Sequence, residues 1–350
     1  MKLGEIREFF LNNWRKIGAV VFLILAIGMG LEVGYQRLVA TPVVPDSEKL
    51  PPFDLAGETA AVKGQVSLVS LSEAELPDKA VAYRAEPLGL TLSESAADEL
   101  AASFGCSNGP RRIPASTEGD GDILVFFGEG STLTVATRPR SLSYVAEYAT
   151  GNEGTLYSQS QALAEAESFM ESKGLPVDAL TAFRVRFLNS GVNVYVEAAD
   201  PAKAEFVEAL FVWTVGERVL LGASPADVAA SLIFDRQGRV VSLKFRYLDS
   251  SFTQFGEVEL LGSDVAVKQL AESGLVVSAN VPGRMSDQAA AVDIYSFAPE
   301  STQLVLCQTA ANDFLYPVYL FEGSGWSSSG VQVNAAVYLP AVSPEYVKER

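Results

Sequence analysis

The sequence predicts an α+β protein, in which an N-terminal transmembrane helix is followed by repeated units of one helix packed on an antiparallel β-meander. Two observations and one general rule support this prediction. A long apolar run lies near the start of the chain, at residues 17–31. Further on, several stretches have apolar residues at helical spacing, and each is followed by runs that alternate as strands do. Helices on one face of antiparallel sheets are typical of the α+β class.

The N-terminal apolar run predicts a single-pass membrane protein. Extended to Tyr35, the segment that begins at Ile17 approaches the roughly 20 residues that a helix needs to cross a bilayer. Basic flanks favour the cytoplasmic side, and the tail before this segment carries Lys2, Arg7, Arg15 and Lys16. We therefore expect residues 1–16 to be a cytoplasmic tail, residues 17–35 to cross the lipid bilayer, and the rest to be extracytoplasmic at the cell membrane.

A cleaved signal peptide is the alternative interpretation of this run. Its length suits the hydrophobic region of a signal peptide, and Gly28 and Gly30 are small residues at a candidate cleavage site. The preceding tail is long for a signal peptide and is itself apolar at Phe9 and Phe10. These features favour the uncleaved anchor.

A linker and two α+β domains are expected after the anchor. Prolines between residues 36 and 61 favour an extended linker. The first α+β unit is expected at residues 62–150. The second domain is expected at residues 151–350, where it divides into two units near residue 260.

Each expected helix begins at a polar residue and ends at a glycine. Thr91 and Glu94 have the spacing of a capping box before the first helix, and Ser158 and Gln161 repeat it before the second. Ser263 is expected to cap the third helix. The glycines expected to end the helices are Gly105, Gly174 and Gly274. Strand-like runs follow each helix, including residues 123–127, 132–136, 142–148, 206–215, 239–247, 303–308, 316–322 and 331–339.

Charge and composition exclude several classes of protein. Hydrophobic residues make up 48% of the chain, enough to bury a core. The formal net charge of −17 disfavours binding to nucleic acid, which is itself anionic. The chain contains no histidine, so neither a Ser-His-Asp nor a Cys-His catalytic arrangement can form.

Motifs for other enzymatic chemistries are missing as well. No lysine has a serine three positions before it, and no phosphate-binding Gly-x-x-x-x-Gly-Lys motif is present. Glu118, Asp120 and Asp122 offer oxygen ligands for calcium, but the complete twelve-residue calcium loop is absent. Among 43 acidic residues, no spacing singles out a carboxylate pair for glycoside hydrolysis. We therefore expect no catalytic residue, no cofactor and no metal.

The two cysteines, Cys106 and Cys307, are candidates for a disulfide if the chain lies outside the cytoplasm. Two buried free thiols are the more ordinary outcome. A second candidate feature is the cluster of aromatic residues Tyr316, Tyr319 and Trp326 near two glycines. These residues are expected either to pack in the core or to form a binding surface.

The second domain resembles PepSY-like and YycI-type extracytoplasmic regulatory domains. The matching pieces are the helix YSQSQALAEAESFMESKGLP, the hairpin FRVRFLNSGVNVYVEA, the strand FVEALFVWTVGERVLL and the closing hairpin SLIFDRQGRVVSLKFRY. The resemblance covers residues 157–274. It implies a domain that binds and restrains other envelope proteins, and it assigns no binding residue.

The sequence thus favours a membrane-anchored extracytoplasmic binding or regulatory module of a bacterial envelope. It would restrain or sense a membrane or envelope protein partner and would not be an enzyme. One alternative is a structural scaffold of an envelope assembly. A second alternative is a hydrolase that uses carboxylates.

Overall fold

The computed structural model describes most of the chain after residue 43. The chain divides into two compact units, Met1–Ser47 and Glu48–Arg350, and the second unit is the one described below. The described residues are 44–55, 60–67, 76–117, 119–147, 154–191, 195–225, 227–281, 292–308 and 313–348.

The predicted membrane anchor finds no support in this structure. Across the described residues, no helix combines the length and the apolar composition that a bilayer crossing needs. The segment from Ile17 to Tyr35, on which the single-pass prediction depended, lies outside the described residues. The structure therefore does not support the prediction that this chain is a single-pass protein of the cell membrane.

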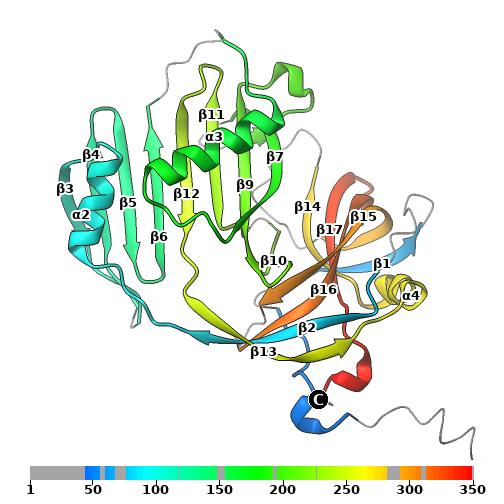
Figure 1. Ribbon diagram of the computed structural model, residues 1–350. Helices are drawn as coiled ribbons and strands as arrows, with labels where there is room; N and C mark the ends of the chain where they lie inside the picture. Colours follow the sequence, from blue (N-terminus) through cyan, green and yellow to red (C-terminus); the bar gives the residue numbers. More distant parts are fainter. Residues whose placement is uncertain are drawn as a thin grey trace, which may run out of the picture. The chain divides into compact units, whose positions relative to one another are not determined.

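Strands dominate the described part of the chain (Figure 1). The α-helices described are α2 (Glu94–Ser103), α3 (Gln159–Ser172) and α4 (Ser263–Ser273), and the short 3-10 turns are η1 (Asp46–Glu48), η2 (Pro201–Lys203) and η3 (Pro344–Tyr346). The strands are β1 (Ala60–Val66), β2 (Lys79–Pro87), β3 (Asn108–Ile113), β4 (Ile123–Gly128), β5 (Ser131–Thr137), β6 (Arg140–Ala146), β7 (Leu180–Ser190), β8 (Tyr195–Glu197), β9 (Phe206–Val215), β10 (Arg218–Leu221), β11 (Ala230–Asp235), β12 (Val240–Arg246), β13 (Ser250–Glu259), β14 (Leu275–Asn280), β15 (Ile294–Gln308), β16 (Phe314–Ser327) and β17 (Gln332–Pro340).

Nine of these strands form an antiparallel sheet in the order β3-β4-β5-β6-β12-β11-β9-β7-β8, which we call the first sheet. The join between β6 and β12 places Leu142 opposite Phe245. The first α+β unit was expected to end at residue 150. Because of this pairing, strands that precede and follow residue 150 belong to one continuous sheet.

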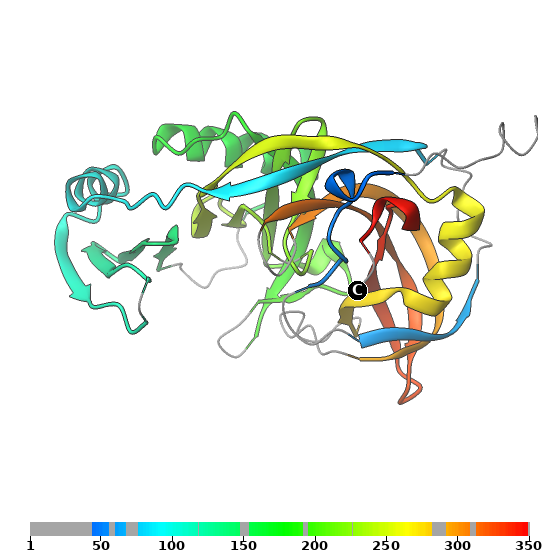
Figure 2. The ribbon, with the colours of Figure 1, turned by 90° about the horizontal axis from the view of Figure 1, so that it is seen from below.

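Helices α2 and α3 lie on one face of the first sheet (Figures 1 and 2). Their inner faces are built from alanine, which allows a helix to approach a sheet closely: Ala97, Ala101, Ala162 and Ala166 are almost fully buried. The strands fill the other side of this core with large aromatic residues: Phe126, Phe211, Phe234 and Phe245.

The helix starts test the three capping predictions. At α4 the prediction of Ser263 is wrong, because the N-cap is Gly262 and no side chain caps the helix. At α3 the predicted capping box is confirmed, because Ser158 and Gln161 each bind the other's backbone N–H through their side chains. At α2 the prediction is wrong. The N-cap is Ser93, whose hydroxyl accepts the Ala96 N–H at 3.2 Å, and not Thr91.

Five further strands close into a ring in the order β1-β14-β17-β16-β15, with β15 returning to β1. The β15–β1 pairing is parallel and places Val62 opposite Ile294. Helix α4 packs against β1 and β17 of this ring. The core cluster built around this ring contains large buried aromatic side chains: Phe297, Tyr316, Tyr319, Phe321 and Tyr338.

Two connections join the ring to the first sheet. Strand β10, the hairpin partner of β9, pairs in parallel with β15. The second connection runs through β13, which follows β12 of the first sheet along the chain and pairs with β2, and β2 in turn pairs at Arg84 with Phe314 of β16.

The predicted fold class is therefore wrong. The structure is a large mixed sheet that includes parallel pairings, and it does not consist of repeated units of a helix on a meander. The third expected unit fails because α4 packs on a ring whose members come from both ends of the chain. Sequence periodicity reports local structure and contains no signal for such distant pairings.

Candidate functional site

The face of the first sheet opposite α2 and α3, which we call the open face, carries a charged pocket. Side chains alternate along a strand. On β9, Val207, Ala209 and Phe211 belong to the core beneath the helices, so Glu208 and Leu210 point to the open face. In the described residues no α-helix covers this face, although β14, β16 and β17 approach it at the pocket.

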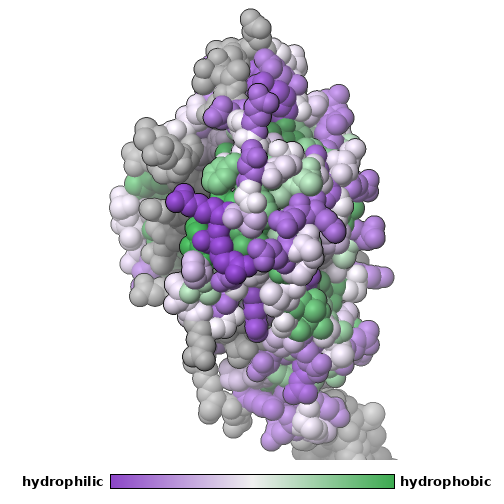
Figure 3. All heavy atoms as spheres, turned by 90° about the vertical axis from the view of Figure 1, so that its left-hand side faces the viewer, coloured by the Kyte–Doolittle hydropathy of each residue, from purple (hydrophilic) through white to green (hydrophobic). Residues whose placement is uncertain are grey.

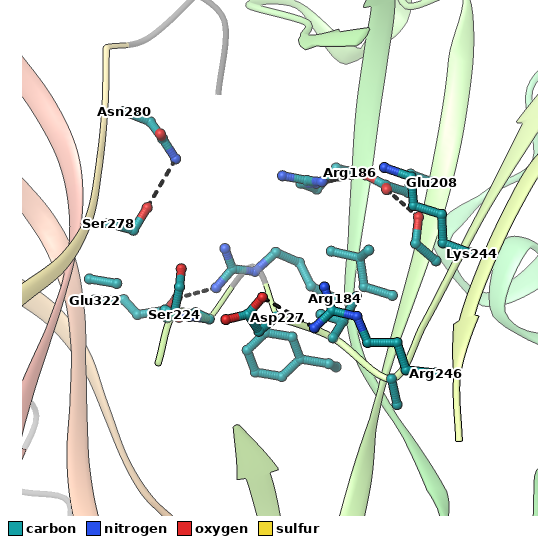
Figure 4. A pocket seen from close by; sticks show the side chains of 17 residues that line it. Arg184, Arg186, Glu208, Ser224, Asp227, Lys244, Arg246, Ser278, Asn280 and Glu322 are labelled. Atoms are coloured by element: carbon teal, nitrogen blue, oxygen red, sulfur yellow. Dashed lines mark hydrogen bonds and ion pairs between the residues drawn. The ribbon is translucent and has the colours of Figure 1, made fainter. Parts of the chain in front are cut away.

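The pocket has a volume of about 440 Å³ and lies between the open face and the ring (Figure 4). Its anionic residues are Glu208, Asp227 and Glu322. Its cationic residues are Arg184, Arg186, Lys244 and Arg246. The lining thus carries one more positive than negative charge, in a chain with a formal net charge of −17.

An inner ion pair forms the floor of the pocket. Arg186 on β7 lies directly opposite Glu208 on β9, and its Nε donates to Glu208 Oε2 at 2.8 Å. The hydroxyl of Ser231 on β11 donates to the other carboxylate oxygen at 2.6 Å. The Glu208 residue is 4% exposed. A carboxylate buried this deeply requires a charged partner and further hydrogen bonds, and both are supplied here.

Two outer ion pairs line the rim. Arg184 on β7 pairs with Glu322 on β16, which ties the first sheet to the ring. Arg246 on β12 pairs with Asp227 at 3.3 Å, and both side chains are well exposed. Pairs as exposed as the second one contribute little to stability and exchange partners readily.

Lys244 differs from the other cations of the pocket. It lies on β12 two residues before Arg246, so the two side chains share the open face. Its side chain is exposed, and no ion pair joins it to any carboxylate within the described part of the chain. The positive charge that the pocket has in excess therefore resides on Lys244.

Asn280 lies on the opposite wall of the pocket. It is the last residue of β14, and its Nδ2 donates to Ser278 Oγ at 3.3 Å. Its Oδ1 is buried and has no hydrogen-bond donor in the described structure. Because this oxygen is buried, it does not lie on the surface of the pocket that a ligand would contact.

A row of residues that carries two exposed apolar side chains, which we call the apolar row, lies on the same open face beyond β12. Phe127 on β4, Thr132 on β5 and Val145 on β6 lie directly opposite one another in register, and Val145 pairs in turn with Ser242 on β12. Phe127 is 42% exposed and Val145 is 52% exposed. At the edge of the sheet where α2 and β3 lie, hydrophobic patches interrupt a largely hydrophilic surface (Figure 3).

Each carboxylate of the pocket forms an ion pair with an arginine. Within the described residues, no group of histidine, cysteine, aspartate or glutamate side chains is placed to hold a metal ion. Of the candidate calcium ligands, Glu118 lies outside the described residues, and Asp122 accepts the Ala115 N–H.

The aromatic residues singled out in the sequence do not form one surface. Tyr316 and Tyr319 are both buried on β16 of the ring, and Tyr319 donates its hydroxyl to Leu261 O at 2.9 Å. Burial raises the pKa of Tyr319 to about 12. Trp326, near the end of β16, is 51% exposed and separate from both.

Cys106 and Cys307 are both free and buried, so the structure contains no disulfide between them. Cys106 packs in the core beneath α2 and α3, and Cys307 packs in the core of the ring. Burial raises the pKa of the Cys307 thiol to about 12, and Asp227 adds to this effect. Neither thiol belongs to the pocket.

Reasoning from sequence missed the pocket, although two signals for it were present. Glu208 interrupts an otherwise apolar run, FVEALFVWTV, and a charge in a buried strand requires a partner. Basic residues recur at every second position in FRVRF and LKFR, which places them on one face of a strand. Neither signal reveals which strands are neighbours.

Comparisons of this chain with models of protein families, with curated proteins and with solved structures found no match. The resemblance of residues 157–274 to PepSY-like and YycI-type domains stays a prediction.

Proposed function

We propose that this chain is a non-catalytic binding module that recognises a protein partner through the open face of its first sheet. The occupant is a partner segment in which acidic groups lie beside apolar ones. The observation that carries the proposal is the placement of an exposed apolar row, with Phe127 and Val145, on the same face as the pocket cations. Such a combination matches the apolar centre and polar rim of protein interfaces.

Charge favours an acidic partner segment at this face. The chain is strongly acidic as a whole, yet Lys244 and Arg246 place exposed positive charge beside the pocket. Local complementarity of this kind steers association and selects the partner. Nucleic acid is disfavoured, because a chain with a formal charge of −17 repels a polyanion at long range.

Two further points support a binding role without catalysis. The chain has no histidine to serve as a general base, and the pocket carboxylates are engaged with arginines. The resemblance to PepSY-like and YycI-type domains also implies binding and restraint of another protein. Regulation of that partner is the role that this resemblance adds to the proposal.

Selection from a library of random displayed peptides against the full chain tests this proposal. Val145→Glu places a negative charge on the apolar row. The matched control is Val265→Glu on α4, where the valine is similarly exposed at 45%. We expect the enriched peptides to be acidic and to bind Val145→Glu at least about tenfold more weakly than the control, which is a difference of about 1.4 kcal/mol.

Two results would contradict the proposal. Peptides that bind both variants equally would place the interface elsewhere on the molecule. Sustained turnover of a glycan or peptide by the purified chain would overturn the non-catalytic assignment.

A further inference from the structure

A bulge in β15 turns two consecutive side chains to the outside of the ring. Ile294 and Phe297 are fully buried, whereas Tyr295 between them is 51% exposed and Ser296 is half-buried. Ser296 pairs with Trp326 of β16 after a shift in register, so Tyr295 has no residue opposite it on that strand. Bulges re-aim side chains in this way and are over-represented beside functional sites.

A row of uncharged residues crosses four strands of the ring at this bulge, and we call it the outer row. Its members lie opposite one another in register: Gln65 on β1, Ser296 on β15, Trp326 on β16 and Gln332 on β17. Trp326 is 51% exposed, and both glutamines are exposed. No hydrogen bond joins these four side chains to other described residues, so their polar groups are available to a ligand.

An open groove continues the outer row on the side of α4. It has a volume of about 510 Å³ and lies between α4 and β1. Gln65 and Ser296 belong both to the outer row and to the lining of the groove, so the two form one continuous site. With neighbouring strands about 4.8 Å apart, the row alone is roughly 14 Å long.

We propose that the outer row and the groove bind a neutral oligosaccharide. Each sugar hydroxyl is both a donor and an acceptor, which matches the side-chain amides of Gln65 and Gln332. The C–H faces of a sugar ring pack on exposed aromatic side chains, and the indole N–H of Trp326 has a hydroxyl to bind. This site is separate from the open face and does not depend on the function proposed for that face.

The lack of charge in the outer row disfavours ionic and purely apolar ligands. Lys63 and Asp293, which flank the bulge, neutralise each other in an ion pair at 2.5 Å. Of the described residues that line the groove, Lys268 alone is charged. A purely apolar ligand would cover the amides and the hydroxyl of the row without giving them hydrogen bonds, which is unfavourable.

The position of the row within the ring disfavours an extended peptide. Such a peptide commonly binds by adding a strand to an unpaired sheet edge. At the centre of the row, Ser296 pairs with both Gln65 and Trp326, and Trp326 pairs with both Ser296 and Gln332. The centre therefore offers side chains to a ligand and no free strand edge.

Calorimetric titration of the full chain with soluble hexasaccharides tests the inference. The neutral probes are the hexamers of β-1,4-linked glucose, α-1,4-linked glucose and β-1,4-linked N-acetylglucosamine, which differ in shape and substituents. The hexamer of galacturonic acid is the anionic comparison. We expect at least one neutral hexamer to bind with a Kd below about 1 mM.

The variants are Trp326→Ala and Gln332→Ala, with Phe127→Ala on the open face as the control for loss of an exposed aromatic side chain. We expect Trp326→Ala to weaken the bound hexamer by at least about tenfold and Gln332→Ala by about threefold. Phe127→Ala should leave the affinity within about twofold, and circular dichroism checks that each variant is folded. The tryptophan emission should shift on binding, and Trp326→Phe should abolish this shift.

Four results overturn the inference: no binding of any neutral hexamer at millimolar concentration, equal effects of Trp326→Ala and Phe127→Ala, tighter binding of the galacturonic acid hexamer than of every neutral one, or an emission shift that persists in Trp326→Phe. Library peptides whose binding depends on Trp326 would show instead that the outer row is a protein interface. The function proposed for the open face is tested separately, through Val145.

Discussion

Arg186 and Glu208 lie directly opposite each other on β7 and β9, and the guanidinium of Arg186 binds one oxygen of the carboxylate at 2.7 and 2.8 Å. The second oxygen accepts the Ser231 hydroxyl from β11. One buried carboxylate therefore ties together three neighbouring strands of the first sheet and forms the floor of the candidate binding pocket.

Removal of this carboxylate should destabilise the fold. Glu208→Ala leaves the half-buried Arg186 without its counter-ion and the Ser231 hydroxyl without its acceptor, and breaking a buried pair in this way lowers the free energy of unfolding by about 3 kcal/mol. Urea unfolding followed by circular dichroism measures the change.

Glu94→Ala is the matched control, because Glu94 pairs with Arg112 where both side chains are more than half exposed. Its effect should stay within about 1 kcal/mol. An equal loss of stability in the two variants would mean that the inner pair has no special structural role.

The close approach of β1 to β15 predicts a strong effect of one methyl group. A Cβ at Gly64 would lie 1.6 Å from the carbonyl oxygen of Tyr295, next to a shift in the register of the two strands. Gly64→Ala should therefore lower the free energy of unfolding by about 2 kcal/mol or more, as overpacking does. The measurement is again the midpoint and slope of urea unfolding.

Gly256→Ala on β13 provides the comparison, since a Cβ there meets no atom within 4 Å and the backbone is compatible with alanine. It should leave stability unchanged or raise it by about 0.5 kcal/mol. If Gly64→Ala were as well tolerated as Gly256→Ala, the parallel β1–β15 pairing that closes the ring would be in doubt.

The thiols of Cys106 and Cys307 should be unreactive in the folded chain. Both are fully buried, and a pKa raised to about 12 keeps Cys307 protonated at neutral pH, where the thiolate is the reactive form. A colorimetric thiol reagent should detect almost no reaction in native buffer and both cysteines after addition of denaturant. A peptide map under non-reducing conditions that links Cys106 to Cys307 would show this prediction to be wrong.

Buried tyrosines in the ring should make the fold sensitive to alkaline pH. Burial raises the pKa of Tyr319 to about 12 and raises the pKa of Tyr316 and Tyr338 above the usual value of 10. Above pH 10 the unfolded chain releases these phenolic protons while the folded chain retains them. The free energy of unfolding should therefore be fully maintained below pH 10 and should fall as pH rises toward 12.

Ultraviolet absorbance of tyrosinate, followed together with circular dichroism, measures both changes. We expect part of the tyrosinate signal to appear only when the chain unfolds. Tyr319→Phe should reduce the alkaline loss of stability, although it also removes the hydrogen bond to Leu261, which contributes about 1 kcal/mol at all pH values. If all of the tyrosinate signal appeared near pH 10 in the folded chain, the burial of these side chains would be contradicted.

Local features of the fold were predictable from the sequence. The capping box of Ser158 and Gln161 lies within four consecutive residues, so its spacing alone indicates the start of α3. Strand β9 coincides with the predicted run at residues 206–215, because a continuous apolar stretch between polar turns is typical of a buried strand. Such signals report interactions between residues close in the chain, and they give no partner for a strand.

The candidate site was not predictable in the same way. That Arg184 and Arg186 share a strand face follows from their spacing, as it does for Lys244 and Arg246. That the two pairs line one pocket follows only from the order β12-β11-β9-β7 and from the approach of β14 and β16. Tyr316 and Tyr319 illustrate the converse. Aromatic residues fit a binding surface as well as a core, and only the tertiary packing on the two faces of β16 buries them.

By itself, the sequence determined the acidic charge, the absence of histidine chemistry and most of the individual helices and strands, since these depend on composition and on short-range periodicity. The tertiary structure alone decided the mixed sheet, the closed ring and the pocket, because each requires strands that are distant along the chain to meet in one register. Hydrogen bonds between strands are nearly the same whatever their side chains. The choice of partner strand therefore depends on packing of the whole core, which no local pattern contains.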